Sequence, residues 1–441
     1  MKCTSAVMAS NPVFSSMYSI EEPNKIVTIR DVEPVELLCG ETSVKTTAVV
    51  KIRWLPKPRL LIECEFKGMH VPKPNHGDQY VIEFPSIGVS TSVDWINRTY
   101  NSSSGTTLTL VPKNGLIERQ QESDLSRTTF HLVNFSNSPM LRGGGIELEA
   151  GGWQIKIDPV PNLKNRTDEL KRSGGYAITH AGEIQYGDNR EFAQGDAIEL
   201  LTALNNFFSF VQGFWVPPLL PVGYSSNNSV IWEQWGVRRT DPWQSVPSWF
   251  NGLHEDPIST LFPGFWSRWN NELWQKAIES AVYWYVRSNT QGSGTDGSII
   301  LTQAALELLS WTTYVEANGG LSKEGFKKLS AADQLRLLLS RTGIPLGVPE
   351  ELQGLSKLAK QFNWDGANAF VNLRNSLVHP GHSREDDFSG GKAIFEGWLL
   401  GMWYLELILL KLFNYDGVYL NRLKLGGWVG DVEDVPWSNS I

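Results

Sequence analysis

The segment AFVNLRNSLVHPGH (residues 369–382) places Arg374, Asn375 and His379 within one short stretch. RNA is cleaved without a metal ion when its 2′-hydroxyl attacks the adjacent phosphate. That reaction needs a group that moves a proton near neutral pH, and histidine suits this role. It also needs a cation on the phosphorane, and arginine suits this role because its guanidinium stays charged and grips two phosphate oxygens. We therefore assign, as a hypothesis, His379 as general acid or base, Arg374 as phosphate clamp and Asn375 as the orienting residue.

The local backbone decides whether these side chains can meet. Five residues apart on a regular helix, Arg374 and His379 differ in direction by about 140°. Pro380 disfavours the helical conformation of His379, so the histidine can turn at the helix end. The alternative is a purely structural pair, in which His379 favours a helix C-terminus and Arg374 pairs with Asp365 or Asp386.

Helical periodicity surrounds this segment from about residue 270 onward. Apolar residues at helical spacing and capping signals predict a series of helices joined by short connections. Short connections favour antiparallel neighbours and hence a compact bundle. The expected helices cover residues 271–289, 299–317, parts of 322–341, 352–362, 365–378 and 391–414, with a short one at 417–423.

The motif within this bundle resembles the R-x(4–6)-H signature of the HEPN superfamily, with a polar residue after the arginine. TQAALELLSW (302–311) is similar to a core helix of that family, and YLELILLKLFNYDGVYLNRL (404–423) to its terminal helix. The resemblance covers about residues 271–423. It implies a homodimer in which two motifs face one cleft, and metal-independent RNA cleavage that leaves a 2′,3′-cyclic phosphate. Glu307 and His382 are accessory candidates.

The N-terminal half is written mostly in short extended segments between residues 25 and 187, punctuated by Gly, Pro, Asn and Ser. Alternation of apolar and polar residues predicts an antiparallel sandwich or barrel-like β domain. A helical pattern interrupts it at 191–213. The fold class is therefore α+β and multidomain. The expected divisions are a β-rich domain at 1–240, a Trp/Pro-rich connection at 241–270, the helical domain at 271–425 and an irregular tail at 426–441.

Composition narrows the functional classes. A net charge of −8 argues against a protein that coats nucleic acid non-specifically. Three unevenly spaced cysteines and no export signal predict a cytoplasmic protein. The apolar run at 393–413 approaches membrane-span length, but Glu396, Glu406 and Lys411 favour a buried helix or a dimer seam over a membrane span.

Two functions from different classes follow. The first is an RNase effector whose β-rich half senses a phage-derived or antitoxin-like regulator, as in antiphage defence or toxin systems. The second is a non-catalytic module that dimerises or binds nucleic acid or protein. A basic groove around the motif would favour the first, and its candidate contributors are Arg336, Arg341, Arg374 and Arg384. No Walker loop, HExxH or CxxC pair occurs, so no cofactor and no metal site is expected.

Overall fold

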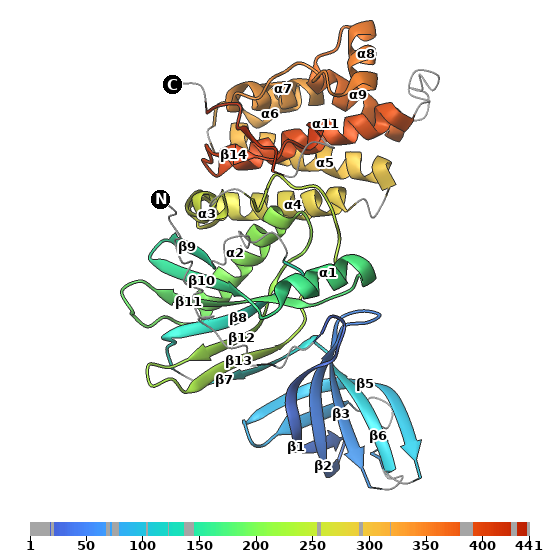
Figure 1. Cartoon of the computed structure of the whole chain (residues 1–441), viewed down its shortest axis with the longest axis vertical. Coiled ribbons are helices and arrows are strands. Elements are labelled where there is room, and N and C mark those ends of the chain that lie inside the picture. Colours follow the sequence, from blue (N-terminus) through green and yellow to red (C-terminus); the bar gives the residue numbers. More distant parts are fainter. Residues whose placement is uncertain are drawn as a thin grey trace, which may run out of the picture.

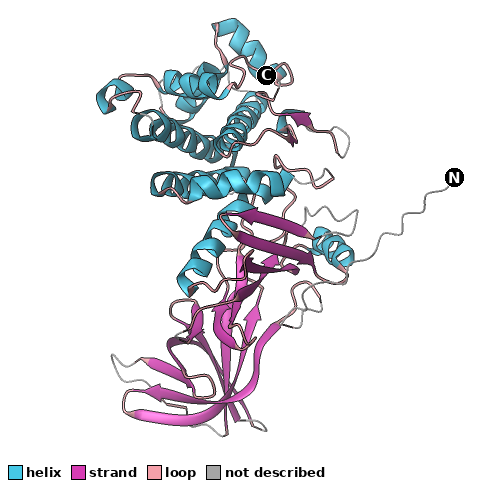
Figure 2. Cartoon of the chain, turned by 90° about the vertical axis from the view of Figure 1, so that its left-hand side faces the viewer, coloured by secondary structure: helices cyan, strands magenta, loops and turns pink. Residues whose placement is uncertain are grey.

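A computed structural model shows the protein as three parts stacked along one long axis (Figure 1). A β-barrel lies at one end, a seven-stranded sheet in the middle and a group of helices at the other end, as the second view also shows (Figure 2). The structure describes residues 18, 22–67, 71–72, 79–102, 105–121, 123–135, 145–253, 257–290, 294–317, 319–379, 391–424 and 430–438.

The barrel is antiparallel and closes in the order β1-β2-β3-β6-β5-β4. Closure comes from pairing of β1 with β4, in which Leu37 lies opposite Ile82. Strand β6 alternates half-buried and buried residues along its whole length, as a strand with one face in a core must. The strands are β1 (Val27–Cys39), β2 (Thr42–Arg53), β3 (Arg59–Phe66), β4 (Tyr80–Phe84), β5 (Val89–Asn101) and β6 (Gly105–Pro112).

The middle sheet has the order β7-β13-β12-β8-β11-β10-β9 and is also antiparallel. One face contributes Val133, Ile178 and Trp235 to the core of the barrel. The other face packs against helix α2 and shares one continuous core with the helical part. The elements are β7 (Leu116–Gln120), β8 (Arg127–Val133), β9 (Ile146–Ala150), β10 (Trp153–Pro159), α1 (Leu163–Ser173), β11 (Ile178–Tyr186), α2 (Gln194–Gln212), β12 (Pro218–Tyr224) and β13 (Val230–Gly236).

The helical part is built around α11 (Gly391–Leu412), which packs against α5, α9 and several other helices. By length and composition α11 passes the test for a membrane span, but 89% of its most apolar window is buried inside the protein. That burial is typical of the core helix of a soluble fold. The other elements are α3 (Pro257–Trp269), α4 (Glu272–Asn289), α5 (Gly294–Trp311), the π-helix η2 (Thr312–Ala317), α6 (Lys323–Lys327), α7 (Ala331–Thr342), α8 (Gln353–Phe362), α9 (Gly366–Val378), β14 (Val418–Tyr419), η3 (Arg422–Lys424) and β15 (Glu433–Asp434).

Two helices differ from the sequence-based expectation. Helix α1 interrupts the β-rich half, where only strands were expected. It buries only Leu163, Arg166 and Leu170, so it carries little apolar periodicity for a pattern search to find. Helix α3 occupies the second half of the 241–270 segment, which was expected to be a connection. Pro263 lies inside α3. Because proline usually ends or kinks a helix, its presence in the sequence argued against a helix at these residues.

Helix α3 depends on a glycine where it meets the end of α11. A Cβ atom on Gly264 would lie 1.7 Å from the backbone oxygen of Phe413, so no side chain fits there. Replacing Gly264 by alanine is therefore expected to destabilise the protein by about 2 kcal/mol, although alanine alone favours a helix by about 1 kcal/mol. Chemical denaturation followed by tryptophan fluorescence measures this.

The matched control is Gly195→Ala, because Gly195 is also helical and nothing lies within 4 Å of its Cβ position. That variant should be neutral or more stable than the parent by up to about 1 kcal/mol. Equal stability of the two variants would show that α3 and α11 do not approach as closely as described.

Candidate functional site

Helix α9 presents the Arg374 segment from a fixed position on α11. Asp365 caps its N-terminus by accepting a hydrogen bond from the Asn368 amide at 2.8 Å. Two glycines of α11 let the helices approach closely. A Cβ on Gly401 would lie 2.3 Å from the ring of Phe370, and one on Gly397 would lie 3.0 Å from Leu373. The two helices therefore run antiparallel, with the C-terminal end of α9 beside the N-terminal end of α11.

Arg374, Asn375 and His379 all lie at this C-terminal end of α9. His379 is exposed and serves as the C-cap, with extended backbone angles (φ −112°, ψ 99°), as expected for a residue before proline. Arg374 and Asn375 are half-buried, and the Nη1 of Arg374 donates to the Asn375 Oδ1 at 3.2 Å. Among the described residues, the Nε of Arg374 is buried without a hydrogen-bond partner, and the side-chain contact of the guanidinium is to an amide and not to a carboxylate.

The structural alternative for Arg374 had named Asp365 as its ion-pair partner. Asp365 instead pairs with Arg336 (Oδ2 to Nε, 2.6 Å), which lies at the opposite end of α9. Burial raises the pKa of Asp365, but the hydrogen bond and the positive charge of Arg336 lower it. The net effect holds the pKa of Asp365 below its usual value. The other named partner, Asp386, lies outside the described residues, as does the groove contributor Arg384. Arg336 is neutralised by acids and does not add positive charge beside Arg374.

The accessory candidates are not joined to this group. Glu307 is an exposed carboxylate on α5 that accepts a hydrogen bond from Gln303 (Nε2 to Oε1, 2.6 Å) on the same helix. His382 lies outside the described residues. Two cavities lined by described residues lie elsewhere in the chain. Among the described residues, no three His, Cys, Asp or Glu side chains gather in a way that could hold a metal ion.

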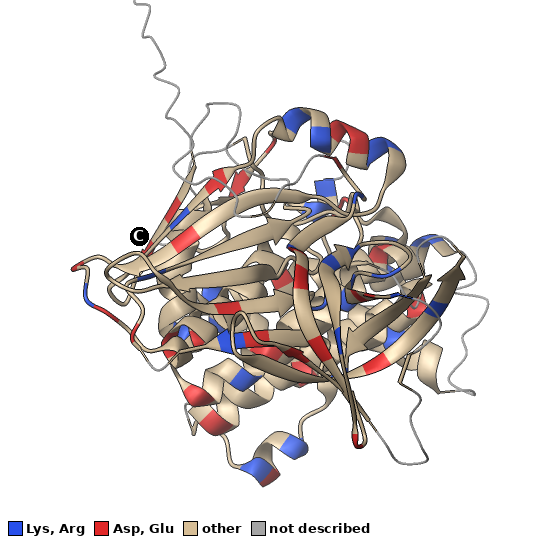
Figure 3. Ribbon diagram, turned by 90° about the horizontal axis from the view of Figure 1, so that it is seen from below, with Lys and Arg blue, Asp and Glu red and all other residues tan. Residues whose placement is uncertain are grey.

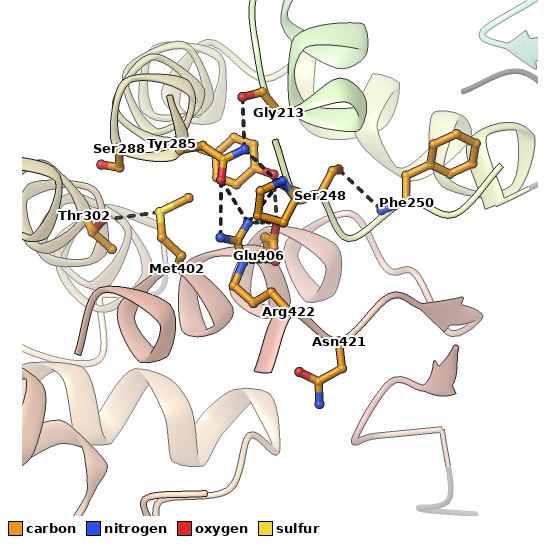
Figure 4. Close-up of polar contacts among 12 residues, drawn as sticks. Gly213, Ser248, Phe250, Tyr285, Ser288, Thr302, Met402, Glu406, Asn421 and Arg422 are labelled. Atoms are coloured by element: carbon orange, nitrogen blue, oxygen red, sulfur yellow. Dashed lines mark hydrogen bonds and ion pairs between the residues drawn. The ribbon is translucent and has the colours of Figure 1, made fainter. Parts of the chain in front are cut away.

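A buried polar network at the centre of the helical part was missed by sequence reasoning (Figure 4). The carboxylate of Glu406 accepts hydrogen bonds from Tyr285 Oη at 2.7 Å and from Arg422 Nε at 2.7 Å, and both Glu406 and Arg422 are fully buried. Asn289 accepts from Arg422 at 3.2 Å and donates to the backbone oxygens of Gly213 and Pro247. The network therefore joins α4, α11 and η3 to the C-terminal end of α2 and to the segment that follows β13.

The charges in this network form an ion pair that is fully buried from solvent. Burial raises the pKa of Tyr285 well above its usual value, and the neighbouring Glu406 charge adds to this. Burial opposes the charge on Arg422, but Glu406 outweighs it and raises the pKa of the arginine. One signal pointed to the network: Glu406 interrupts an apolar run, and a buried charge needs a partner.

Basic and acidic residues are mixed along the chain. Seen from the barrel end, the positions of Lys and Arg residues are interspersed with those of Asp and Glu residues over the strands and helices (Figure 3). This distribution agrees with a net charge of −8.

These features define a class of protein: a closed β-barrel, a seven-stranded antiparallel sheet and a helical domain. A buried ion pair lies within the helical domain, and hydrogen bonds from Asn289 connect it to Gly213 and Pro247, outside that domain. Two family models match the chain, the YopA central domain over residues 120–246 and the YopA C-terminal domain over residues 271–434. The "SPbeta prophage-derived uncharacterized protein YopA" of Bacillus subtilis (strain 168) is 30% identical over 440 residues, which cover 95% of this chain and 96% of that protein. The chain belongs to the YopA family. No solved structure matches it.

The comparisons overturn the expected HEPN resemblance. No HEPN family is detected, and the helical region expected to be a HEPN domain is matched by the YopA C-terminal domain. The resemblance was wrong because it depended on one arginine, one polar residue and one histidine in a helical setting. A spacing of so few common residue types recurs by chance in long chains and carries little family information.

Proposed function

We propose that the helical domain of this YopA-family protein cleaves RNA in the cytoplasm without a metal ion, with Arg374, Asn375 and His379 as its site. The observation that carries the proposal is the state of Arg374. Its guanidinium is half-buried, its Nε has no hydrogen-bond partner, and no carboxylate of the described residues pairs with it. A partly buried cation in this condition favours an anion, and a phosphate accepts from guanidinium in a bidentate manner.

The chemistry follows from the neighbouring groups. The 2′-oxygen attacks phosphorus and loses its proton, and the 5′-oxygen leaves with a proton, so the products are a 2′,3′-cyclic phosphate and a 5′-hydroxyl. His379 is exposed at the C-cap of α9, five residues after Arg374, and moves one of these protons. Arg374 neutralises the charge that develops on the phosphorane. Asn375 is engaged with Arg374 and orients the guanidinium.

A homodimer stays part of the proposal. Val378 and Phe395 are 37% and 41% exposed, and the antiparallel packing of α9 on α11 places both at the same end as His379. Exposed apolar side chains beside the site favour a protein contact there. An antiphage or toxin role, with a phage-derived or antitoxin-like regulator at the N-terminal half, stays a prediction.

The test is cleavage of a labelled RNA by the purified full chain in EDTA. The expected result is cleavage with 2′,3′-cyclic phosphate ends, reduced about 100-fold or more in His379→Ala and Arg374→Ala. The matched control is Lys360→Ala, which removes an exposed charge from the last turn of another helix, α8. Equal cleavage by all four proteins would refute the site, because the activity would then come from elsewhere.

The alternative is a non-catalytic binding module, favoured by the acidic net charge. It predicts that no RNA is cleaved by the chain under any of these conditions. It also predicts that Arg374→Ala weakens RNA binding while His379→Ala leaves it unchanged, because only the arginine is needed to hold a phosphate.

A further inference from the structure

A cavity of about 470 Å³ lies at the other end of α11 from His379. Its walls come from the end of α3, the start of α4, the π-helix η2, the end of α7 and the last turn of α11. Along α11, Lys411 lies fourteen residues beyond Gly397, which faces α9, so the two regions are about 21 Å apart. Nothing in the ribonuclease proposal uses this cavity. Its volume suits a small molecule of nucleotide size.

Three cations converge on this cavity, Arg268, Arg341 and Lys411. Arg268 donates from Nε to the backbone oxygen of Leu412 at 3.1 Å, and no described residue accepts a hydrogen bond from its two terminal nitrogens. Each cation lies near an aromatic ring: Arg268 is 5.6 Å from Trp274, Arg341 is 5.9 Å from Tyr314, and Lys411 is 4.9 Å from Trp437. Within the described part of the chain none of the three makes an ion pair.

One carboxylate, Glu316, also lines the cavity. It accepts a hydrogen bond from the Trp311 Nε1 at 3.0 Å and is within 4.0 Å of none of the three cations. The lining therefore carries an excess of two positive charges, three cations against one carboxylate. Asn271 caps α4 by accepting from the amides of Leu273 and Trp274, so the positive charge at the site comes from the side chains and not from free helix amides.

The helix dipole explains the positions of two of the three cations, but it does not explain why all three face one cavity. Arg341 and Lys411 each lie in the last turn of a helix, where the helix dipole favours a cation. That preference explains each residue singly. It does not explain why both helix ends, together with Arg268, face one hollow that a π-helix borders, and π-helical turns are frequent at functional sites.

We propose that this cavity binds a small phosphorylated ligand of nucleotide size. Arg268 and Arg341 grip phosphate oxygens with their forked guanidinium groups, and Lys411 acts as a point charge. Thr313 and Thr342 also line the cavity, but their hydroxyl groups donate to the carbonyl oxygens of Leu309 at 2.7 Å and Leu338 at 2.9 Å, so the contacts to phosphate come from the cations. A small molecule is favoured over a nucleic-acid strand because all three cations line one cavity of about 470 Å³, a volume that a single nucleotide-sized ligand fills.

The test is isothermal titration of the full chain with inorganic pyrophosphate and, separately, with ATP in EDTA. Both are expected to bind, and Arg341→Gln and Lys411→Gln should each weaken binding about 10-fold or more. Lys360→Gln is the matched control, since it removes a cation from the last turn of α8, outside the cavity. It should bind like the parent. Circular dichroism spectra of each variant establish that it is folded.

Other results would overturn the proposal. These are no heat of binding from either probe up to about 10 mM, a range that covers weak millimolar sites, or binding that neither cavity variant weakens. Binding of an RNA oligonucleotide that depends on Arg341 and Lys411, without binding of pyrophosphate or ATP, would assign the cavity to nucleic acid instead. His379→Ala should leave pyrophosphate binding unchanged, so the outcome here is separable from that of the ribonuclease proposal.

Discussion

Replacing Arg422 by methionine is expected to lower the free energy of unfolding by about 3–5 kcal/mol. Both Arg422 and Glu406 have no exposed side-chain surface, so removal of the arginine leaves a carboxylate buried without its counter-charge. Asn289 loses its two hydrogen bonds from Arg422 at the same time. Urea denaturation followed by tryptophan fluorescence measures the loss, because several buried tryptophans lie in the same continuous core.

Two further variants separate the ion pair from general damage to the core. The double variant Glu406→Leu with Arg422→Met should be less destabilised than the sum of the two single variants, because neither charge is then left alone. Asp168→Asn breaks the exposed pair with Lys171, at 4.0 Å, and should change stability by less than about 0.5 kcal/mol. A loss below about 1 kcal/mol in Arg422→Met, or strict additivity in the double variant, would show that the network does not hold the domains together.

The network also shows what a sequence can and cannot tell. Glu406 was visible as a charge within an apolar run, but its partners lie 16 and 121 residues away, at Arg422 and Tyr285. No local pattern connects such positions. Closure of the barrel also depends on contacts between distant parts of the sequence, because β1 pairs with β4 and two strands lie between them in the chain. The extended character of each strand could be predicted, whereas the pairing that turns strands into a barrel is non-local.

Elements with strong periodicity were predicted closely. The helix expected at 271–289 is α4 (Glu272–Asn289), and the one expected at 365–378 is α9 (Gly366–Val378). The non-helical backbone of His379 was also expected, because proline restricts the residue before it locally. The charge partners were not predictable: Arg336, a candidate contributor to a basic groove around Arg374, pairs with Asp365 at the opposite end of α9. Backbone restrictions are local, but ion pairs depend on how helices pack.

Stability should also fall steeply in mild acid because two histidines are buried on opposite faces of the middle sheet. His131 faces Tyr18 in the barrel core, and His180 faces Phe135 on the side of α2. Burial lowers the pKa of His131 to about 4 and that of His180 to about 3. An unfolded chain binds protons at these residues below about pH 6.5, whereas the folded chain stays neutral there. Each histidine should therefore cost about 2 kcal/mol of stability at pH 5 relative to pH 7.5, about 4 kcal/mol together.

Carboxyl groups act in both directions in this pH range, so the histidine contribution must be isolated by difference. Burial raises the pKa of Asp241 and of Glu183, and such groups favour the folded state as the pH falls. Urea denaturation of the parent and of His180→Gln at both pH values removes these shared contributions, since the amide of glutamine does not titrate. The pH-dependent loss should be smaller in the variant by about 2 kcal/mol, whatever its absolute stability. An identical loss in both proteins would mean that His180 is protonated, or reaches water, in the folded chain.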